Sequence, residues 1–449
     1  MPTRKPKPAA PPRTFDDDVP PPPAKESSTA DAPRSGAIVA VTRRAAERVR
    51  NGHPWVYASD IAERIPPAGD AAIGSGSVVT VAQAQGALLG SALYSSTSQI
   101  ALRMVSDGIL ASREEFLALL EERLRRAIGW RQDWLARTPD TDACRLVFSE
   151  ADALPGIMLD RYGDLVILQL LTQGTAQPDV RSLVRDVVRQ MLNPAALVER
   201  PDPRIRELEQ LPAPAAAPLF ARDENAPKTV TQFLLNGLRF HYDANSGQKT
   251  GAFLDQRENY RAAEQYAHGR GLDVCTYQGG FALHLARRCA HVTGVDVSRA
   301  ALEVAERNLE ANRAQLTADG GVAWIEANAF DLLRDWSDSG EMFDTIVLDP
   351  PAFAKSKRAV EGAVRGYKEL NLRALKMLRP GGTLVTCSCS HHVSLAEFQA
   401  AVASAAADAK RRVRLLAVRG AAVDHPAILT VPETQYLKCL ICEVAWDQP

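Results

Sequence analysis

The stretch RGLDVCTYQGGFALHLARRCAHVTGVDVSRAALEVAERNLEANR, residues 270 to 313, decides the fold of the C-terminal half of this chain. It predicts a strand (RGLDVCTY), a helix (GGFALHLARRCA), a second strand (HVTGVDV) and a second helix. The alternation continues through VAWIEA, FDTIVLDPP, GYKELNLRALKML and GGTLVTCSCS. Alternation at this spacing indicates right-handed βαβ units and a mostly parallel α/β sheet, which we assign to a domain spanning residues 231 to 449.

Two further regions precede this domain. Residues 1 to 36 carry ten of the 29 prolines and a single aromatic residue, so they bury too little surface to fold and are expected to form a disordered tail. Residues 37 to 112 contain short β-type runs separated by glycine and serine turns, with a basic stretch between the first two runs. This pattern predicts a small β-barrel with one helix.

A middle α+β domain is expected over residues 113 to 230. Its first 25 residues have helical apolar spacing, and two strands flank the turn LPG at 154 to 156. A second helix is predicted at about 178 to 192. The stretch from 201 to 227 is rich in proline and alanine and is interpreted as an irregular connection.

Composition limits the class of protein. The 449 residues are 46% apolar, enough for two or three domains, but the apolar runs are strand-sized and the N-terminus lacks the apolar core of a signal peptide. We therefore expect a cytoplasmic protein that does not contact membranes. Seven cysteines, an odd number in a long chain, indicate reduced thiols. A net charge of −1 neither demands nor excludes nucleic acid, because a local basic face decides binding.

The first two strands of the α/β domain end in acids that suit an adenosine ligand. Asp273 is followed by Gly279 and Gly280, which allow the backbone to approach a ligand, and Asp296 follows 23 residues after Asp273. An acid at that spacing accepts hydrogen bonds from ribose hydroxyls. The dinucleotide fingerprint G-x-G-x-x-G is absent, which disfavours a dehydrogenase and favours S-adenosylmethionine; a plain turn at the two glycines is the alternative.

Other residues complete the expected cofactor site. Tyr277 lies in the glycine loop and Val297 follows Asp296. After the third strand, Asn328 is placed to face the adenine amino group, while Ala329 and Phe330 are placed to line the ring. An ordinary core role for Phe330 is an equal alternative.

The fourth strand delivers Asp349 and then stops at two prolines, which cannot continue a strand. An acid followed by Pro-Pro-x-aromatic suits a nucleobase site, in which the carboxylate or a loop carbonyl holds an edge N–H and Phe353 stacks. A charged strand cap is the alternative. We predict a nucleobase site, because the whole string DPPAF is specific.

The string TCSCSHH, residues 386 to 392, ends the fifth strand. Four ligands in one turn do not suit zinc, and a redox pair normally has C-x-x-C spacing, so we expect no metal site here. CLIC at 439 to 442 has that spacing, but residues three apart on a strand face opposite sides, so it predicts a terminal strand. Cys387 is expected in the core, whereas Cys389, past the strand end, is the candidate nucleophile with polar neighbours that lower its pKa.

Several strings together are similar to one family. The chain resembles S-adenosylmethionine-dependent ribosomal RNA methyltransferases that make 5-methylcytosine in the large subunit. The resemblance covers nearly everything after the tail. Its strings are RNGHPWVYASDI (50–61), SEADALPGIMLDRYGD (149–164), QKTGAFLDQREN (248–259), LDVCTYQGGFALHLA (272–286), VLDPPAFAKSK (347–357), GYKELNLRALKML (366–378), TCSCSHH (386–392) and PETQYLKCL (432–440).

The resemblance implies a PUA-type RNA-binding domain, an α+β middle domain and a class I, Rossmann-like methyltransferase domain. Cys389 matches the methylating cysteine and Asp349 the strand-end acid. A loop that closes over the methionine part of the cofactor would contain Lys249, Thr250, Phe253 and Arg257. The chain departs from the family pattern in two places: Asn328 stands where an acid is common, and no cysteine follows Pro351 to assist product release.

The implied reaction is covalent attack of Cys389 on C6 of cytosine, followed by methylation of C5. The N-terminal segment with Arg43, Arg44, Arg48, Arg50, Trp55 and Tyr57 is expected to position ribosomal RNA through its phosphates. The alternatives are methylation of a ring or exocyclic nitrogen, which needs no thiol, and an inactive RNA-binding assembly factor. The assembly state is left open, with a homodimer as one option.

Overall fold

The computed structural model describes residues 36–445, apart from 201, 246–251, 317–320 and 355. Its C-terminal part is a seven-stranded sheet with strand order β16-β15-β14-β17-β18-β20-β19. Pairing is parallel from β16 to β18, and β20 is antiparallel to both of its neighbours. The expected mostly parallel α/β sheet is therefore confirmed. The strands are β14 (Arg270–Val274), β15 (His291–Asp296), β16 (Gly321–Glu326), β17 (Phe343–Leu348), β18 (Leu378–Ser388), β19 (Val413–Arg419) and β20 (Lys438–Val444).

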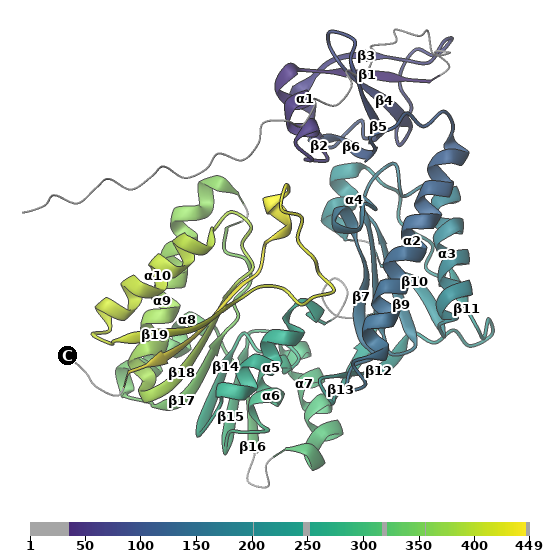
Figure 1. Cartoon of the computed structure of the whole chain (residues 1–449). Helices are drawn as coiled ribbons and strands as arrows, with labels where there is room; N and C mark the ends of the chain where they lie inside the picture. The colour runs from purple at the N-terminus through teal and green to yellow at the C-terminus, as the bar shows by residue number, and fades with distance from the viewer. Residues whose placement is uncertain (1–35, 201, 246–251, 317–320, 355, 446–449) are drawn as a thin grey trace, which may run out of the picture. The chain divides into compact units, whose positions relative to one another are not determined.

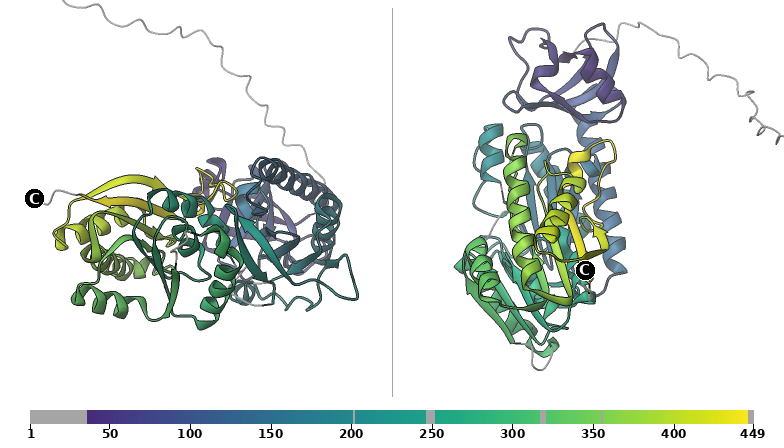
Figure 2. Two further views of the ribbon diagram at one scale, coloured as in Figure 1. Left: turned by 90° about the horizontal axis from the view of Figure 1, so that it is seen from below. Right: turned by 90° about the vertical axis from the view of Figure 1, so that its left-hand side faces the viewer.

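Helices cover both faces of this sheet (Figures 1 and 2). Helices α5 (Arg257–Tyr266), α6 (Gly280–Leu285) and α7 (Arg299–Asn312) contribute to the core on one face. Helices α8 (Ala329–Ser339), α9 (Val360–Met377) and α10 (Leu395–Asp408) cover the other. Cys439 lies in the first core and Cys442 in the second, as alternation along a strand requires. No helix among the described residues is long and apolar enough to span a membrane.

The strand order reverses between β14 and β17, because β15 and β16 lie on one side of β14 and the later strands on the other. Crossover helices on opposite faces leave a crevice at the carboxyl ends of the strands at such a point. Asp273, Asp349 and Cys389 lie at or just beyond those ends. The topology therefore brings the residues expected to be functional to one edge of the sheet.

The N-terminal unit is a six-stranded sheet, with order β2-β6-β5-β4-β1-β3. Because β2 and β3 are its edges, the predicted barrel is an open, curled sheet. Its helix α1 (Arg43–Arg50) begins after Thr42, whose side chain accepts a hydrogen bond from the Ala45 N–H. The strands are β1 (Ile38–Val41), β2 (Trp55–Tyr57), β3 (Ile61–Ile65), β4 (Val78–Gln83), β5 (Leu88–Tyr94) and β6 (Ile100–Ser106).

The middle unit is a five-stranded sheet, with order β11-β10-β9-β8-β7. Two long helices contribute apolar residues to its core, α2 (Arg113–Ala136) and α3 (Pro178–Leu192), as the sequence predicted. The expectation of an irregular connection at 201–227 is wrong in part. This stretch contains helix α4 (Pro203–Glu209), which is capped by Asp202, and strand β11. The strands are β7 (Ala143–Phe148), β8 (Ile157–Tyr162), β9 (Leu165–Leu170), β10 (Ala196–Glu199) and β11 (Phe220–Ala221).

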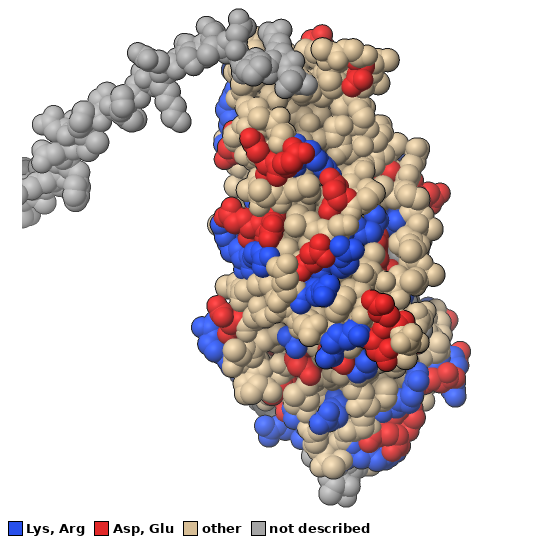
Figure 3. All heavy atoms as spheres, turned by 90° about the vertical axis from the view of Figure 1, so that its right-hand side faces the viewer, with Lys and Arg blue, Asp and Glu red and all other residues tan. Residues whose placement is uncertain are grey.

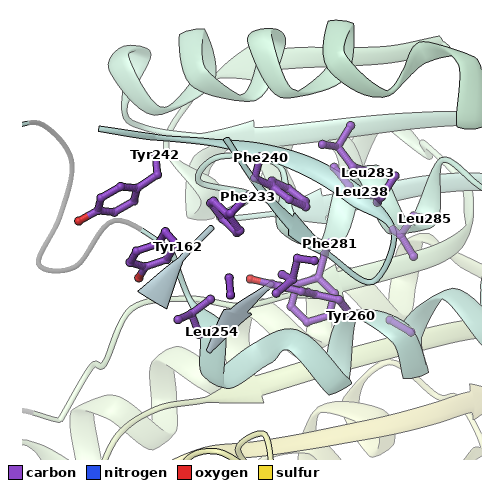
Figure 4. Packing of buried hydrophobic residues seen from close by; sticks show 14 of the residues in the cluster. Tyr162, Phe233, Leu238, Phe240, Tyr242, Leu254, Tyr260, Phe281, Leu283 and Leu285 are labelled. Carbon is purple, nitrogen blue, oxygen red and sulfur yellow. The ribbon is translucent and has the colours of Figure 1, made fainter. Parts of the chain in front are cut away.

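A hairpin of β12 (Val230–Leu235) and β13 (Leu238–Asp243) connects the middle sheet to the C-terminal one. Its turn is Asn236–Gly237, both with positive φ, a dipeptide that is the strongest short hairpin signal. Tyr162 of the middle sheet stacks on Tyr242 of the hairpin, with ring centroids 4.0 Å apart. Figure 4 shows the cluster that joins the two units, in which the aromatic residues are Tyr162, Phe233, Phe240, Tyr242, Tyr260 and Phe281.

A long excursion, residues 420–437, connects β19 to β20 and leaves the sheet (yellow in Figure 1). Its Ala422 N–H donates to the Asp255 carbonyl at 2.8 Å. Its Asp424 binds Arg257 of α5, and its Thr430 hydroxyl donates to the Gly52 carbonyl at 2.9 Å. The excursion therefore contacts segments that are far away in the sequence.

Candidate active site

The loop after β14 is fixed by Asp273, which is fully buried. One oxygen of its carboxyl group, Oδ2, accepts hydrogen bonds from the Thr276 hydroxyl at 2.5 Å and the Ala282 N–H at 2.8 Å. The other oxygen, Oδ1, has no hydrogen-bond partner among the described residues. Burial raises the pKa of Asp273 to about 7. A buried acceptor without a partner is costly, so this oxygen suits a ligand that donates a hydrogen bond.

Asp296 shapes the same loop from the end of β15. Its carboxylate accepts the Tyr277 N–H and the Ser298 N–H, both at 2.9 Å. The next side chain, Val297, is 72% exposed and presents an apolar surface beside this loop. Asp296, Tyr277 and Val297 are thus brought together as the sequence predicted.

The two glycines of the loop also leave space for aromatic side chains of this chain. A Cβ atom on Gly279 would lie 2.9 Å from the Trp324 ring, and one on Gly280 would lie 2.6 Å from the Tyr260 hydroxyl. Gly279 also has φ +85°, a conformation that favours glycine. Their missing side chains make room for Trp324 and Tyr260 of this chain, and Gly280 also lines the pocket described next.

A pocket of about 450 Å³ opens beside this loop. Asp349 lies in its wall, together with Phe253, Tyr260, Tyr277 and Gly280. The Asp349 carboxyl is buried and accepts a hydrogen bond from Gln256 Nε2 at 3.0 Å. Burial, and next the charge of Asp255, raise its pKa to about 8. The group is therefore mostly protonated at neutral pH and has a proton to donate.

Asn328 caps the start of α8, where its Oδ1 accepts the Phe330 N–H at 2.9 Å. This oxygen is therefore already engaged, although the residue is exposed at the sheet edge. Ala329 and Phe330 pack partly against the core, and the ring centroid of Phe330 lies 5.8 Å from that of Phe353. Phe353 also packs on Tyr367 at 4.8 Å. Phe330 and Phe353 thus contact each other on the face of the sheet that α8 and α9 cover.

Arg257 does not reach the pocket. Its guanidinium is buried, forms two 2.9 Å hydrogen bonds with the Asp424 carboxylate and lies 4.2 Å over the Trp134 ring. The expected contact to a cofactor is therefore wrong for Arg257 in this structure, because its charge is already paired. Phe253, from the same string, is 43% exposed and packs edge-on against Tyr277. Lys249 and Thr250 lie outside the described residues.

Cys389 follows β18 and is partly exposed, whereas Cys387 is fully buried in the core. The Cys389 Sγ lies 3.9 Å from the Pro350 carbonyl oxygen, so the thiol and the DPPAF string are adjacent. Burial, and next the charge of Asp349, raise the pKa of the Cys389 thiol to about 12. The expectation that its neighbours lower this pKa is therefore wrong in net effect. His391 contacts the Glu433 carbonyl oxygen instead of the thiol.

Three polar residues of the site were not expected from the sequence. Gln256 binds Asp349 as described, and its own orientation is fixed by Asn259, whose amide donates to Gln256 Oε1 at 2.7 Å. The Tyr436 hydroxyl donates to the Asp255 carboxylate at 2.6 Å. Lys438 donates to the Ser390 carbonyl at 2.6 Å. All three belong to strings quoted above, but no local pattern indicates their contacts.

The basic residues expected to contact RNA are mostly on the surface of the N-terminal sheet. Arg43, Arg44 and Arg50 are exposed, with Arg43 paired to Glu47 and Arg50 bound to Gln83. The Trp55 indole N–H donates to Glu150 at 2.9 Å, so that edge of the ring is already engaged. Arg44 is exposed, and among the described residues no carboxylate oxygen lies within 4.0 Å of its guanidinium. Arg48 is half-buried and binds Asp60 at 2.7 Å.

Comparisons with known proteins identify the family of this chain. Residues 39–107 match the PUA-like domain family, and residues 165–415 match the S-adenosylmethionine-dependent methyltransferase family. The chain belongs to this methyltransferase family. The methyltransferase is 36% identical over 396 residues to ribosomal RNA large subunit methyltransferase I of Klebsiella pneumoniae subsp. pneumoniae, an alignment that covers 87% of this chain and 94% of the relative. The protein of that name from Escherichia coli O127:H6 is 36% identical over 394 residues, which cover 87% and 95%.

Solved structures agree with the fold. The methyltransferase superposes on SMU.776, solved as a complex with SAH, with a TM-score of 0.74 at 20% identity over 91% of this chain and 100% of the other. A second structure, from Streptococcus mutans, gives 0.73 at 19% identity, with the same shares covered. At these identities the likeness supports the fold alone.

The residues of the site fit S-adenosylmethionine. The orphan Oδ1 of Asp273 is an acceptor suited to an ammonium group, and the exposed Val297 offers an apolar surface for an adenine ring. Asp296 keeps lone pairs for ribose hydroxyls beyond the two N–H groups that it accepts. The ammonium group, the ribose and the adenine ring of the ligand therefore each have a matching group at the sheet edge.

Proposed function

We propose that the methyltransferase transfers a methyl group from S-adenosylmethionine to C5 of a cytosine in large-subunit ribosomal RNA. The observation that carries this proposal is the adjacency of Cys389 and the Asp349 loop, with Sγ 3.9 Å from the Pro350 carbonyl. A thiol is needed to activate C5 of a pyrimidine, whereas methylation of nitrogen needs only the DPPAF string. The names of the relatives support ribosomal RNA as the substrate.

Two side chains, Cys389 and Asp349, act on the target cytosine. Cys389, as thiolate, forms a bond to C6, which makes C5 nucleophilic. Asp349, which is mostly protonated at neutral pH, donates its proton to N3, and its other oxygen accepts from the amino group. The cofactor supplies an electrophilic methyl group. Loss of the C5 proton to a base then breaks the S–C6 bond, so that Cys389 leaves as the thiolate, N3 returns its proton to Asp349 and the aromatic ring is restored.

Identification of the product tests this function. The protein is incubated with large-subunit ribosomal RNA and S-adenosylmethionine carrying a deuterated methyl group, and the nucleosides are analysed by mass spectrometry. We expect deuterated 5-methylcytidine at a single position. A labelled nucleoside methylated on nitrogen would replace this function with nitrogen methylation. A protein that binds RNA but neither binds the cofactor by calorimetry nor labels RNA would be an assembly factor.

Asp296 provides a prediction for the cofactor. We expect Asp296→Ala to weaken S-adenosylmethionine binding by about 1–3 kcal/mol, because ribose hydroxyls lose their acceptor in a partly buried site. Isothermal titration calorimetry measures the change. Asp335→Ala, a substitution of an exposed acid on α8, is the control and should leave the affinity unchanged. Equal affinity in Asp296→Ala and the wild type would show that the ribose lies elsewhere.

We also propose that residues 38–105 position RNA mainly through its phosphates. Accessible cations of α1, above all Arg44, support this role. By contrast, Figure 3 shows a face of the molecule on which cationic and acidic side chains are interspersed. Pairs such as Arg125–Glu121 and Arg126–Glu122 on α2 leave little net positive charge to attract phosphates.

The phosphate contact makes a salt-dependent prediction. Arg44→Ala is expected to weaken binding to large-subunit ribosomal RNA and to reduce the slope of log K against log salt by about 1, the share of one phosphate contact. Fluorescence anisotropy at several salt concentrations measures the slope. Arg126→Ala is the matched control, because that arginine is paired on α2. An unchanged slope in Arg44→Ala would show that Arg44 does not contact an RNA phosphate.

A further inference from the structure

Gln256 ends the short helix before α5 (Leu254–Gln256) and binds the carboxyl group of Asp349 through its side-chain amide. It is 3% exposed, and its Nε2 lies 3.0 Å from Asp349 Oδ1. An amide donates through its nitrogen and accepts through its oxygen, and the two atoms exchange places when the group turns over. The orientation of Gln256 therefore decides whether this oxygen of Asp349 accepts a hydrogen bond or carries a proton.

The hydrogen bonds of Asn259 on α5 fix this orientation. Asn259 is fully buried, its Oδ1 accepts from Arg419 Nε at 3.1 Å, and its Nδ2 donates to the Gly420 carbonyl oxygen at 3.0 Å. A guanidinium only donates and a carbonyl oxygen only accepts, so the Asn259 amide satisfies both partners in one orientation alone. The same Nδ2 donates to Gln256 Oε1 at 2.7 Å, which leaves the Gln256 N–H group for Asp349.

The end of β19 thus sets the direction of a chain of hydrogen bonds that ends at Asp349. Because Oδ1 of Asp349 faces an N–H group, it accepts, and a proton on this carboxyl group belongs on Oδ2. No group of the described residues donates to Oδ2, and Asp349 lies in the wall of the pocket beside the cofactor loop. Oδ2 is therefore the oxygen that remains for a bound base.

The Gln256 N–H group also matters when the proton leaves. Burial, and next the charges of Asp255 and Asp273, raise the pKa of Asp349, whereas the hydrogen bond from Gln256 lowers it. A hydrogen bond to an ionised acceptor is about twice as strong as one to a neutral acceptor. Gln256 therefore stabilises Asp349 more after proton transfer than before it.

We propose that Gln256 is the positioning residue for Asp349: it holds Oδ1 as an acceptor, so that the acid proton lies on Oδ2, and it stabilises the carboxylate that forms. The inference rests on the proton donation by Asp349 to the cytosine proposed above. In that step the Oδ2–H bond breaks, an N3–H bond forms and the carboxylate keeps the electron pair. The Cys389 thiolate loses its negative charge as it bonds to C6, so the charge moves to a carboxylate that already has a donor.

Infrared spectroscopy of the full-length protein tests this role without RNA. Spectra are recorded from about pH 6 to about pH 10, where ordinary carboxyl groups are already ionised. The C=O band of protonated Asp349 is identified by its absence from Asp349→Asn. Gln256→Met keeps the size of the side chain but removes the donor. We expect its Asp349 band to lie at higher frequency, because the C=O group no longer accepts a hydrogen bond, and to persist to a pH about one unit higher.

A change at Asn259 tests the direction of the hydrogen bonds while Gln256 stays in place. Asn259→Asp keeps the acceptor for Arg419, but as a carboxylate it cannot donate to Gln256, whose amide then turns its oxygen toward Asp349. We expect single-turnover methyl transfer to large-subunit ribosomal RNA to be about tenfold slower in both variants, the effect of one hydrogen bond to a charged group. Gln132→Met, which removes an amide that binds the Met191 carbonyl, is the control and should change neither the band nor the rate.

The outcomes separate the role of Gln256 from the function of the protein. Unchanged affinity for S-adenosylmethionine shows that a variant is folded, and if one of the two variants does not fold, the other is used. An Asp349 band with the same frequency and pH range in the wild type and the variant would overturn the role of Gln256. A wild type without this band at about pH 6 would also overturn it, because Asp349 would have no proton to direct. A product methylated on nitrogen would overturn the proposed function instead, whatever the infrared result.

Discussion

Cys389→Ala is expected to lower the rate of methyl transfer on the order of a thousandfold or more, because the thiol forms the bond that activates C5. The affinity for S-adenosylmethionine should stay near the wild-type value, since an interaction made only in the chemical step does not contribute to ground-state binding. Single-turnover transfer to large-subunit ribosomal RNA and calorimetry measure the two quantities. A folded Cys389→Ala protein that still makes 5-methylcytosine would contradict the assignment.

A substrate analogue that cannot complete the reaction tests the role of Cys389 by forming a stable covalent adduct. RNA with 5-fluorocytosine at the target should remain bound to the wild-type protein on a denaturing gel, because fluorine at C5 cannot leave as a proton and the thiol is not expelled. Cys389→Ala should form no such adduct. Cys387→Ala is the matched control: Cys387 is fully buried two residues away, so its loss should cost stability but retain the adduct.

Arg257→Met is expected to lower the free energy of unfolding by about 3–5 kcal/mol, because it leaves the buried Asp424 carboxylate without the guanidinium that donates two hydrogen bonds to it. Burial opposes the ionisation of Asp424, but the charges of His425 and Arg257 hold the pKa of its carboxyl below the usual range. The Arg257–Asp424 pair is among the most deeply buried ion pairs of the described residues. The shift of the urea midpoint, with an unchanged slope, measures the loss.

Arg261→Met on the same helix is the control for this effect. Arg261 pairs with Asp140, but both side chains are more than 40% exposed, so the expected loss is at most about 1 kcal/mol. The double variant Arg257→Met/Asp424→Leu should be less destabilised than the sum of the single variants, because no unpaired charge remains. Equal losses of unfolding free energy in Arg257→Met and Arg261→Met would show that the buried pair contributes no more to stability than the exposed pair.

The sequence predicted those features that local patterns determine. Alternating strands and helices indicated the parallel sheet, and strand alternation placed Cys387 in the core and Cys389 at the strand end, as observed. Acids at strand ends predicted that Asp273, Asp296 and Asp349 would meet at one edge. These inferences use spacings of a few residues and the known behaviour of parallel sheets, so they do not depend on distant contacts.

The features that the sequence did not predict depend on partners far along the chain. Arg257 lies in a family-like loop string, but its charge is taken by Asp424, 167 residues later. The space beside Gly280 is filled by Tyr260, and the carboxyl of Asp349 is bound by Gln256, 93 residues earlier. The net effect of burial on the Cys389 thiol also depends on the assembled site. No pattern within a single element contains this information.

The order of the strands has a consequence for synthesis on the ribosome. Strand β20 is the last in the sequence but lies between β18 and β19, and the excursion before it carries Asp424 and Tyr436. Until these last residues emerge, at a rate of about 5–20 residues per second, the edge of β18 is unpaired and Arg257 lacks its partner Asp424. The nascent chain thus already contains Cys389, but Tyr436 joins its surroundings only when translation is nearly complete. Premature termination before residue 420 therefore yields a chain with Cys389 but without the residues that complete its surroundings.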